Sequence, residues 1–206
     1  MLKAFCIWSL LALTSMDGAL GQILNADQRF VVAIKKVLEN EGGLANNNYD
    51  NGNITNYGIS LRYLKTLGKE GDINKDGRID KQDIYLLTKF AAANIYKKQF
   101  WDKYGLYRIN NLQLATKILD LSINMGINQL IVLLKRAILK IDPNFIAPKD
   151  IPFIICYVNK YPPFILLNAL IKQAKYFYTN LVNKRPQDQI FLKGWLKRAD
   201  DISIDS

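Results

Sequence analysis

Apolar residues recur along most of this chain at the three- and four-residue spacing that places them on one face of a helix. The first such segment, 27–40, carries Phe30, Ile34 and Leu38 on one side, and Gly42 marks its end. The same spacing predicts further helices over 60–67, 83–104, 112–124, 127–141, 164–181 and 190–199. The alternation typical of a strand is limited to 54–59. The pattern therefore predicts a mainly α fold.

Composition excludes several classes of chemistry. The chain has 206 residues, half of them apolar, so it can bury a substantial core. It contains no histidine, which excludes Ser-His-Asp and Cys-His nucleophile systems and argues against a His-ligated zinc site. Acid–base chemistry must therefore fall to carboxylates, tyrosine, lysine or cysteine.

The net charge of +10 bears on the choice of partner. It fits either an ordinary solvated basic surface or attraction to a polyanion. The sequence carries no helix-turn-helix, zinc-finger or aromatic RNA-binding pattern, so a nucleic-acid partner would rest on charge alone. Anionic bacterial wall polymers fit the carboxylates described below better.

The first 21 residues have the form of a secretory signal peptide. Lys3 precedes an apolar run over 4–14, and the small residues Ala19 and Gly21 stand before Gln22. The run is shorter than the roughly 20 residues that span a bilayer. We therefore expect export to the periplasm or the cell exterior, a mature chain that begins at Gln22, and no stable membrane span. A retained signal-anchor and a buried first helix are the alternatives.

Cleavage of the signal peptide would also decide which cysteines remain in the mature chain. Removal of the signal peptide removes Cys6 and leaves Cys156 alone, so no intrachain disulfide can form. The apolar neighbours of Cys156 predict a small buried residue rather than a nucleophile.

Glu41 is the strongest candidate for chemistry. It stands at the C-terminal end of the first predicted helix, where the helix dipole disfavours a negative charge. A carboxyl group kept partly protonated near neutral pH is what protonation of a glycosidic oxygen requires. The polar stretch that follows, 44–58, brings Asp50 and Thr55 onto the same loop. Two carboxylates beside a hydroxyl indicate the pairing that glycoside hydrolysis uses.

Residues 72–83 match a calcium-binding loop position after position. Oxygen-bearing side chains stand at positions 1, 3, 5, 9 and 12, glycine stands at 6, and the backbone carbonyl of position 7 completes the set. The predicted ligands are Asp72, Asn74, Asp76, Arg78 (through its carbonyl), Asp80 and Asp83. The aspartate at position 12 is shorter than the usual glutamate, which weakens calcium binding or favours magnesium. The alternative is a polar turn that holds no metal.

Two short motifs carry a resemblance to a known family. Glu-Gly-Gly at 41–43 ends the first helix, and Thr-Asn-Tyr-Gly-Ile-Ser at 55–60 ends the polar loop. This pair, followed by the acidic loop 72–83, resembles the catalytic part of the glycoside hydrolase family 108 muramidases. The stretches 120–126 and 191–198 resemble the peptidoglycan-binding part usually fused to it. The polar loop departs from the family by asparagines where Asp-Pro and Pro are frequent.

The resemblance implies an architecture and roles. It implies a lysozyme-like helical catalytic part over 22–108, with an EF-hand or dockerin-like loop, and a helical wall-binding part over 109–206. Glu41 would be the general acid, and Asp50 and Thr55 would hold or activate the water, as in phage-type lysozymes. The alternatives are a turn residue for Asp50 and a loop cap for Thr55.

Further residues are expected at the substrate. Asn56 and Tyr57 would line the sugar groove or buttress the turn, and Asn124 would contact substrate from the second part. Phe191 and Trp195 are expected to be core residues more readily than sugar platforms.

These observations predict an exported N-acetylmuramidase that cuts the β-1,4 bond between N-acetylmuramic acid and N-acetylglucosamine. Peptidoglycan would be its partner, the protein would act as a monomer, and calcium or magnesium would stabilise the fold without joining the chemistry. The alternative is a calcium-stabilised peptidoglycan-binding module that has lost catalysis.

Overall fold

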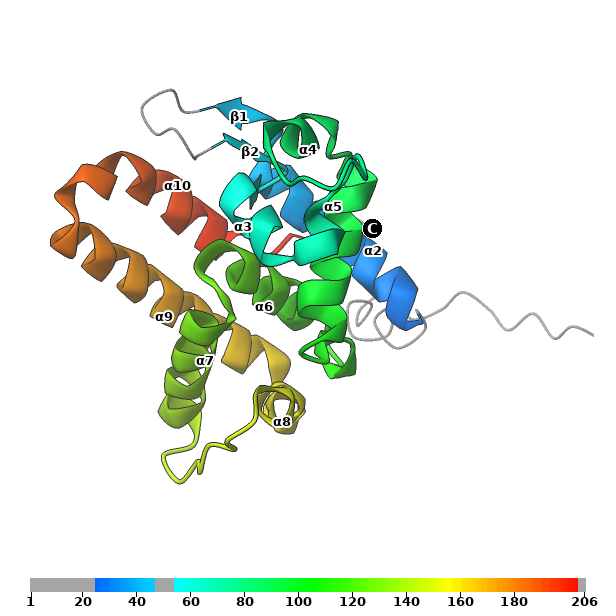
Figure 1. Cartoon of the computed structure of the whole chain (residues 1–206). Helices are drawn as coiled ribbons and strands as arrows, with labels where there is room; N and C mark the ends of the chain where they lie inside the picture. The colour runs from blue at the N-terminus through cyan, green and yellow to red at the C-terminus, as the bar shows by residue number, and fades with distance from the viewer. Residues whose placement is uncertain (1–24, 47–53, 204–206) are drawn as a thin grey trace, which may run out of the picture.

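The computed structural model describes residues 25–46 and 54–203, and this part of the chain is mainly α (Figure 1). Its longer helices are α2 (Ala26–Glu41), α6 (Leu112–Met125), α7 (Ile127–Ile141), α9 (Pro163–Lys184) and α10 (Gln189–Asp200). Its shorter helices are α3 (Leu61–Thr66), α4 (Lys81–Leu86), α5 (Lys89–Tyr96) and α8 (Ile151–Tyr157). Single helical turns occupy Gly68–Gly71, Lys97–Asp102, Leu106–Arg108, Val158–Lys160 and Pro186–Asp188. None of the helices in these ranges is long and apolar enough to cross a membrane.

A small antiparallel sheet stands beside α4 at the top of Figure 1. Its strands, in spatial order, are β1 (Ala45–Asn46), β2 (Ile54–Asn56) and β3 (Ile59–Ser60). β1 follows directly on the end of α2, so the sheet lies where the candidate catalytic carboxylate does.

The first helix forms as the sequence predicts. Asn25 caps it by accepting hydrogen bonds from the backbone N–H groups of Asp27 and Gln28, and the Gln28 side chain returns a bond to Asn25 N. Gly42, with a φ of 72°, ends the helix at Glu41. The capping box and the terminal glycine thus fix the position of Glu41.

α6 is the centre of the packing. Most of its residues from Leu112 to Ser122 are buried, and it packs against α2, α7 and α9. One continuous hydrophobic core extends from Phe30 on α2 to Ala199 on α10. The core therefore runs across residue 108, and the division into a catalytic part (22–108) and a wall-binding part (109–206) stays a prediction about function.

The helix predicted over 83–104 is wrong as a single element. α4 ends before Leu87, whose ψ of 114° is extended, and Thr88 caps α5 by accepting a hydrogen bond from Ala91 N at 3.1 Å. The chain then continues as the π-helical turn Lys97–Asp102. The break escapes a periodicity argument because this cap lies inside an apolar pattern that continues on both sides.

The proline-rich segment after α7 contains a helix that the pattern missed. Pro152 stands in the first turn of α8, where its missing N–H would have no helical partner anyway. α8 buries Ile154 and Ile155 and exposes Cys156. The expectation that Cys156 is buried is therefore wrong, because the helical period turns it away from the core.

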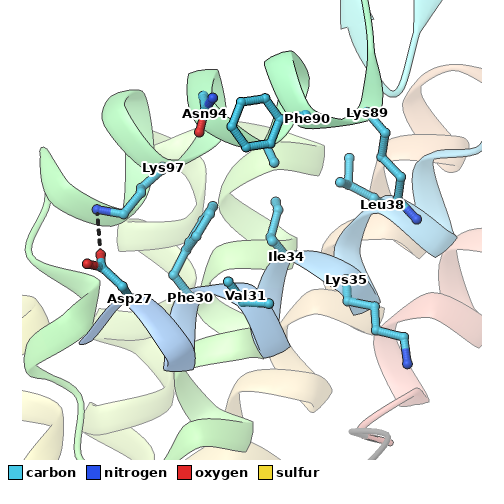
Figure 2. Close-up of a pocket in the computed structure, with 11 residues that line it drawn as sticks. Asp27, Phe30, Val31, Ile34, Lys35, Leu38, Lys89, Phe90, Asn94 and Lys97 are labelled. Carbon is cyan, nitrogen blue, oxygen red and sulfur yellow. Dashed lines mark ion pairs between the residues drawn. The ribbon is translucent and has the colours of Figure 1, made fainter. Parts of the chain in front are cut away.

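An apolar groove of about 680 Å³ lies between α2 and α5 (Figure 2). Val31 and Ile34 of α2 face Phe90 of α5 across it, and an ion pair between Asp27 and Lys97 at 3.1 Å closes one end. Val31 is 62% exposed and Phe90 is 76% exposed. The candidate catalytic carboxylate is not among the lining residues, so this groove is separate from the site described next.

Candidate active site

The segment predicted as one strand is a hairpin that ends beside Glu41. β2 and β3 pair with Asn56 opposite Ile59. The two residues between them, Tyr57 and Gly58, have φ values of 50° and 78°, the signs that a two-residue type I′ turn requires. A bulky residue seldom adopts this region, so the surrounding structure must hold Tyr57 there. The Tyr96 hydroxyl contributes by donating a hydrogen bond to Tyr57 O at 2.9 Å.

Asn56 anchors the hairpin to α4. Its side chain is buried, and Nδ2 donates to the carbonyl oxygens of Ile84 at 3.0 Å and Leu87 at 3.1 Å. Both hydrogens of that nitrogen are used inside the fold, which favours the buttressing alternative for Asn56 over a contact with substrate. Thr55 is only partly buried, on the strand that pairs with both of its neighbours.

Glu41 packs directly against the turn. A Cβ atom added to Gly58 would stand 2.7 Å from Glu41 Cδ and 2.8 Å from the Tyr96 hydroxyl oxygen, and closer still to Glu41 Oε2. Glycine is therefore required at position 58 for two reasons, its positive φ and the close approach of the carboxyl group. The Glu41 side chain is 13% exposed.

Arg198 of α10 binds the other oxygen of this carboxylate. Its NH2 nitrogen lies 2.5 Å from Glu41 Oε1 and 2.8 Å from Asp120 Oδ1, while Nε donates to Asp120 Oδ1 at 2.9 Å. Lys117 supports the arrangement by donating to Arg198 O at 2.7 Å, and it lies 3.6 Å from Asp120 Oδ2. Two acidic and two basic side chains thus form one network that joins α2, α6 and α10.

Burial sets the electrostatics of this network. Burial alone would lower the pKa of Arg198, but the carboxylates of Asp120 and Glu41 outweigh it and hold the pKa above its ordinary value. Burial lowers the pKa of Lys117, and Asp120 only partly offsets the effect. The Arg198 guanidinium therefore stays a cation that pairs with Glu41 Oε1.

Two buried tyrosines complete the surroundings. Burial raises the pKa of Tyr96, and the negative charge of Glu41 raises it further. Burial also raises the pKa of Tyr178, whose hydroxyl donates to Asn124 Oδ1 at 2.7 Å. Both phenols stay neutral hydrogen-bond donors.

Two hollows lie near the partners of Glu41, although Glu41 itself lines neither of them. The first, of about 540 Å³, is bordered by the end of α2, by Asn124 of α6 and by the α10 face that carries Arg198. The second, of about 630 Å³, is lined by Tyr63 of α3, by the π-helical turn and by residues 125–129. Asn124 of α6 lines the first hollow and Met125 lines the second. Glu41 is linked to the first hollow through Arg198, which lines it and pairs with Glu41.

The structure brings together part of the predicted site. Glu41 contacts the hairpin that bears Thr55 and Tyr57, and Asn124 lines the neighbouring hollow. Asp50 lies outside the described residues.

Sequence reasoning missed three groups that surround Glu41: Arg198, Asp120 and Tyr96. The sequence did contain a signal for Asp120 and Arg198. Asp120 begins and Arg198 ends the two stretches, 120–126 and 191–198, that resemble the family in the second half of the chain. The resemblance assigned both stretches to wall binding and did not identify Glu41 as a partner of either residue.

The acidic loop is closed by its own backbone. Asp72 accepts hydrogen bonds from Asp76 N at 3.2 Å and Gly77 N at 2.9 Å. Asp83 is fully buried, and its two oxygens accept from Ile73 N at 2.7 Å and from the backbone N of residue 80 at 2.8 Å. Within 25–46 and 54–203, no three acidic or cysteine side chains gather as a metal cluster would. Metal binding by this loop stays a prediction.

Comparison with known proteins adds two findings. Residues 34–126 match the family profile described as Glycosyl hydrolase 108, which spans Glu41, the hairpin, the acidic loop and α6. Among solved structures, the chain is similar to SagA of Brucella abortus, with a TM-score of 0.63 and 23% sequence identity. That match covers 84% of this chain and 90% of the other, and it indicates a shared fold. No curated protein matches the chain.

Proposed function

The chain belongs to the glycosyl hydrolase 108 family through residues 34–126, and on that premise we propose that it is an exported N-acetylmuramidase. The family makes it a glycoside hydrolase, with peptidoglycan as its substrate class. The proposed reaction is cleavage of the β-1,4 bond between N-acetylmuramic acid and N-acetylglucosamine. The observation that carries the proposal is the carboxylate of Glu41, which is bound by Arg198 and packed against Gly58.

Glu41 is the proposed general acid. Arg198 occupies Oε1, so the second oxygen, Oε2, is left to carry the proton. Oε2 lies beside Gly58, and the proposal places the leaving-group oxygen against this atom. Arg198 acts as a positioning residue, since its bond fixes the orientation of the carboxyl group before substrate arrives.

The water would be held by the other two residues of the proposed set. Thr55 stands on the hairpin that packs against Glu41, and Asp50 precedes it on the same connection. Asp50 would act as the general base and Thr55 would orient the water by one hydrogen bond.

The hollow lined by Arg198 would receive a stretch of the glycan strand close to Glu41. A net charge of +10 would attract the anionic wall. A mature N-terminus at Gln22, a monomeric state and a structural calcium or magnesium ion in the loop 72–83 belong to the same proposal.

Replacement of the proposed acid tests this function. Glu41→Gln keeps size and shape but removes the proton donor, so wall hydrolysis should fall by roughly 10²–10⁴-fold. Clearing zones in a gel that contains purified peptidoglycan report the activity, and the melting temperature reports folding. Asp150→Asn is the control, because Asp150 is an exposed carboxylate at the start of α8 and lines neither hollow. Wild-type clearing by a folded Glu41→Gln protein would refute the assignment.

A wall-binding module without catalysis is the second candidate. The ion pair between Glu41 and Arg198 favours it, because the guanidinium already occupies one oxygen of the proposed acid. Purified wild-type protein that sediments with peptidoglycan and clears none of it would support this function and refute the first.

A further inference from the structure

We infer that the apolar groove between α2 and α5 is a binding site for a fatty acid. The acyl chain would lie along the groove, and its carboxylate would lie at the end that carries Lys35 and Lys89 (Figure 2). Glu41 does not line this groove, so the inference adds a second ligand to the protein and does not depend on the proposed function.

The floor of the groove belongs to the hydrophobic core. Phe30, Ile34 and Leu38 recur at four-residue spacing along one face of α2, and each is at most 5% exposed. Phe30 packs against the fully buried Trp101, with the ring centroids 5.6 Å apart. The floor is therefore a fixed apolar strip that exists before any ligand arrives.

The walls of the groove expose more apolar surface than the fold requires. α5 already buries Ala92, Ile95 and Tyr96 in the core, while Phe90 stands on another face of the same helix. Phe90 is 76% exposed, and it faces Val31 of α2, which is 62% exposed, across the groove (Figure 2). Apolar side chains that gather in this way around one hollow mark a binding site. The volume of about 680 Å³ lies within the range of small-molecule sites.

The two ends of the groove differ in charge. At one end Lys97 lies 3.1 Å from Asp27 and 2.9 Å from Asp102, so its positive charge is already balanced. At the other end lie the side chains of Lys35 and Lys89, one from each helix (Figure 2). Among the described residues that line the groove, Asp27 is the one acidic residue, and it belongs to the first end. A complementary ligand is therefore uncharged along its length and negative at one end.

This distribution of charge favours an acyl chain over other apolar partners. The face of α2 that lines the groove runs from Asp27 to Leu38, which corresponds to about 16 Å of helix. An acidic amphipathic helix would spread its carboxylates along that length, whereas the groove offers its unbalanced positive charge at one end. A flat membrane surface would meet the projecting side chains of Val31 and Phe90 and leave the floor between them uncovered. A single acyl chain is narrow enough to reach the floor.

Calorimetric titration with tetradecanoate, below the concentration at which it forms micelles, tests the inference. One molecule should bind per chain, and Phe90→Ser should weaken binding by roughly tenfold because it removes one wall of the groove. Lys89→Glu should weaken binding by about as much, since it places a like charge beside the carboxylate. Phe153→Ser and Lys172→Glu are the matched controls, because both residues are exposed on helices that do not border the groove. Both control variants should bind tetradecanoate as the wild type does.

Two further probes test the head group and the source of the ligand. Tetradecyltrimethylammonium has the same chain with a positive head, so the wild type should bind it roughly tenfold less tightly, and Lys89→Glu should reverse that preference. Equal affinity for the two amphiphiles would overturn the inference, and so would the absence of binding heat with tetradecanoate. Binding to phosphatidylglycerol vesicles without binding of tetradecanoate would also overturn it and would indicate a membrane surface. Groove variants that lose tetradecanoate should still clear peptidoglycan as the wild type does, so failure of this inference is distinguishable from failure of the proposed function.

Discussion

Gly58→Ala is expected to separate activity from stability at the candidate active site. Alanine in the left-handed region occupied by Gly58 costs about 1–2 kcal/mol of folding free energy. The second effect is steric. The new Cβ would stand 2.7 Å from Glu41 Cδ, whereas ordinary contact begins at 3.4 Å. The carboxyl group must therefore retreat by at least 0.7 Å, and its bond to Arg198 must change with it.

The displacement sets the size of the effect on catalysis. A misplacement of about 1 Å in a reacting group can cost on the order of 10²-fold in rate. Glu41 is the end of a flexible side chain, so the fold can absorb the movement more cheaply than the reaction can. We expect the melting temperature to fall by roughly 2–8 °C and the initial rate of turbidity clearing to fall by about 100-fold.

Gly68→Ala is the control for the backbone cost. Gly68 also has a positive φ, of 57°, and a Cβ atom there would meet nothing within 4 Å. This variant should lose similar stability and keep its activity. A Gly58→Ala protein that clears peptidoglycan within twofold of the wild type would refute the claim that the turn positions the acid.

Three further outcomes are expected. Arg198→Met should lower the free energy of unfolding by about 3–5 kcal/mol because it leaves the buried Asp120 without its partner, and a loss below 1 kcal/mol in urea unfolding would contradict this. If the acidic loop binds calcium, a 100-fold excess over Kd should add about 2.7 kcal/mol, and Asp76→Ala should abolish the shift; no calorimetric heat and no shift would leave a polar turn. Burial above all raises the pKa of Tyr63 and of Tyr161 to about 12 from 10.0. The folded state then holds more protons than the unfolded state between these values, so stability should fall as pH rises from 10 to 12, and a flat urea midpoint across that range would contradict the burial of these phenols.

Helices were predictable where local signals agreed. α2, α6 and α7 combine an apolar face with a cap or a terminal glycine, such as Asn25 with Gly42 or Asn111 with Gly126. Where the capping and proline signals conflicted with the apolar spacing, the helix prediction was wrong. Thr88 offered a cap inside an unbroken apolar period, and Pro152 resembled a helix breaker while it stood in a first turn.

The site was predictable to the extent that it is local. Glu41 and the hairpin are joined by a short connection, and their motifs could be read together. The charged residues around Glu41 could not be predicted from the sequence. Asp120 and Arg198 come from helices far along the chain, and only tertiary packing decides which charges meet. The same limit applies to Asn56, whose anchoring role depends on two carbonyl groups about thirty positions later.

The ion pair between Glu41 and Arg198 has a consequence for timing, because 157 positions separate the two residues. At a synthesis rate of about 5–20 residues per second, the carboxylate leaves the ribosome roughly 8–30 s before the guanidinium that holds it. During that interval the chain has Glu41 but not the guanidinium that pairs with it. If Arg198 positions the acid as proposed, the site is complete only when α10 has been made and has docked.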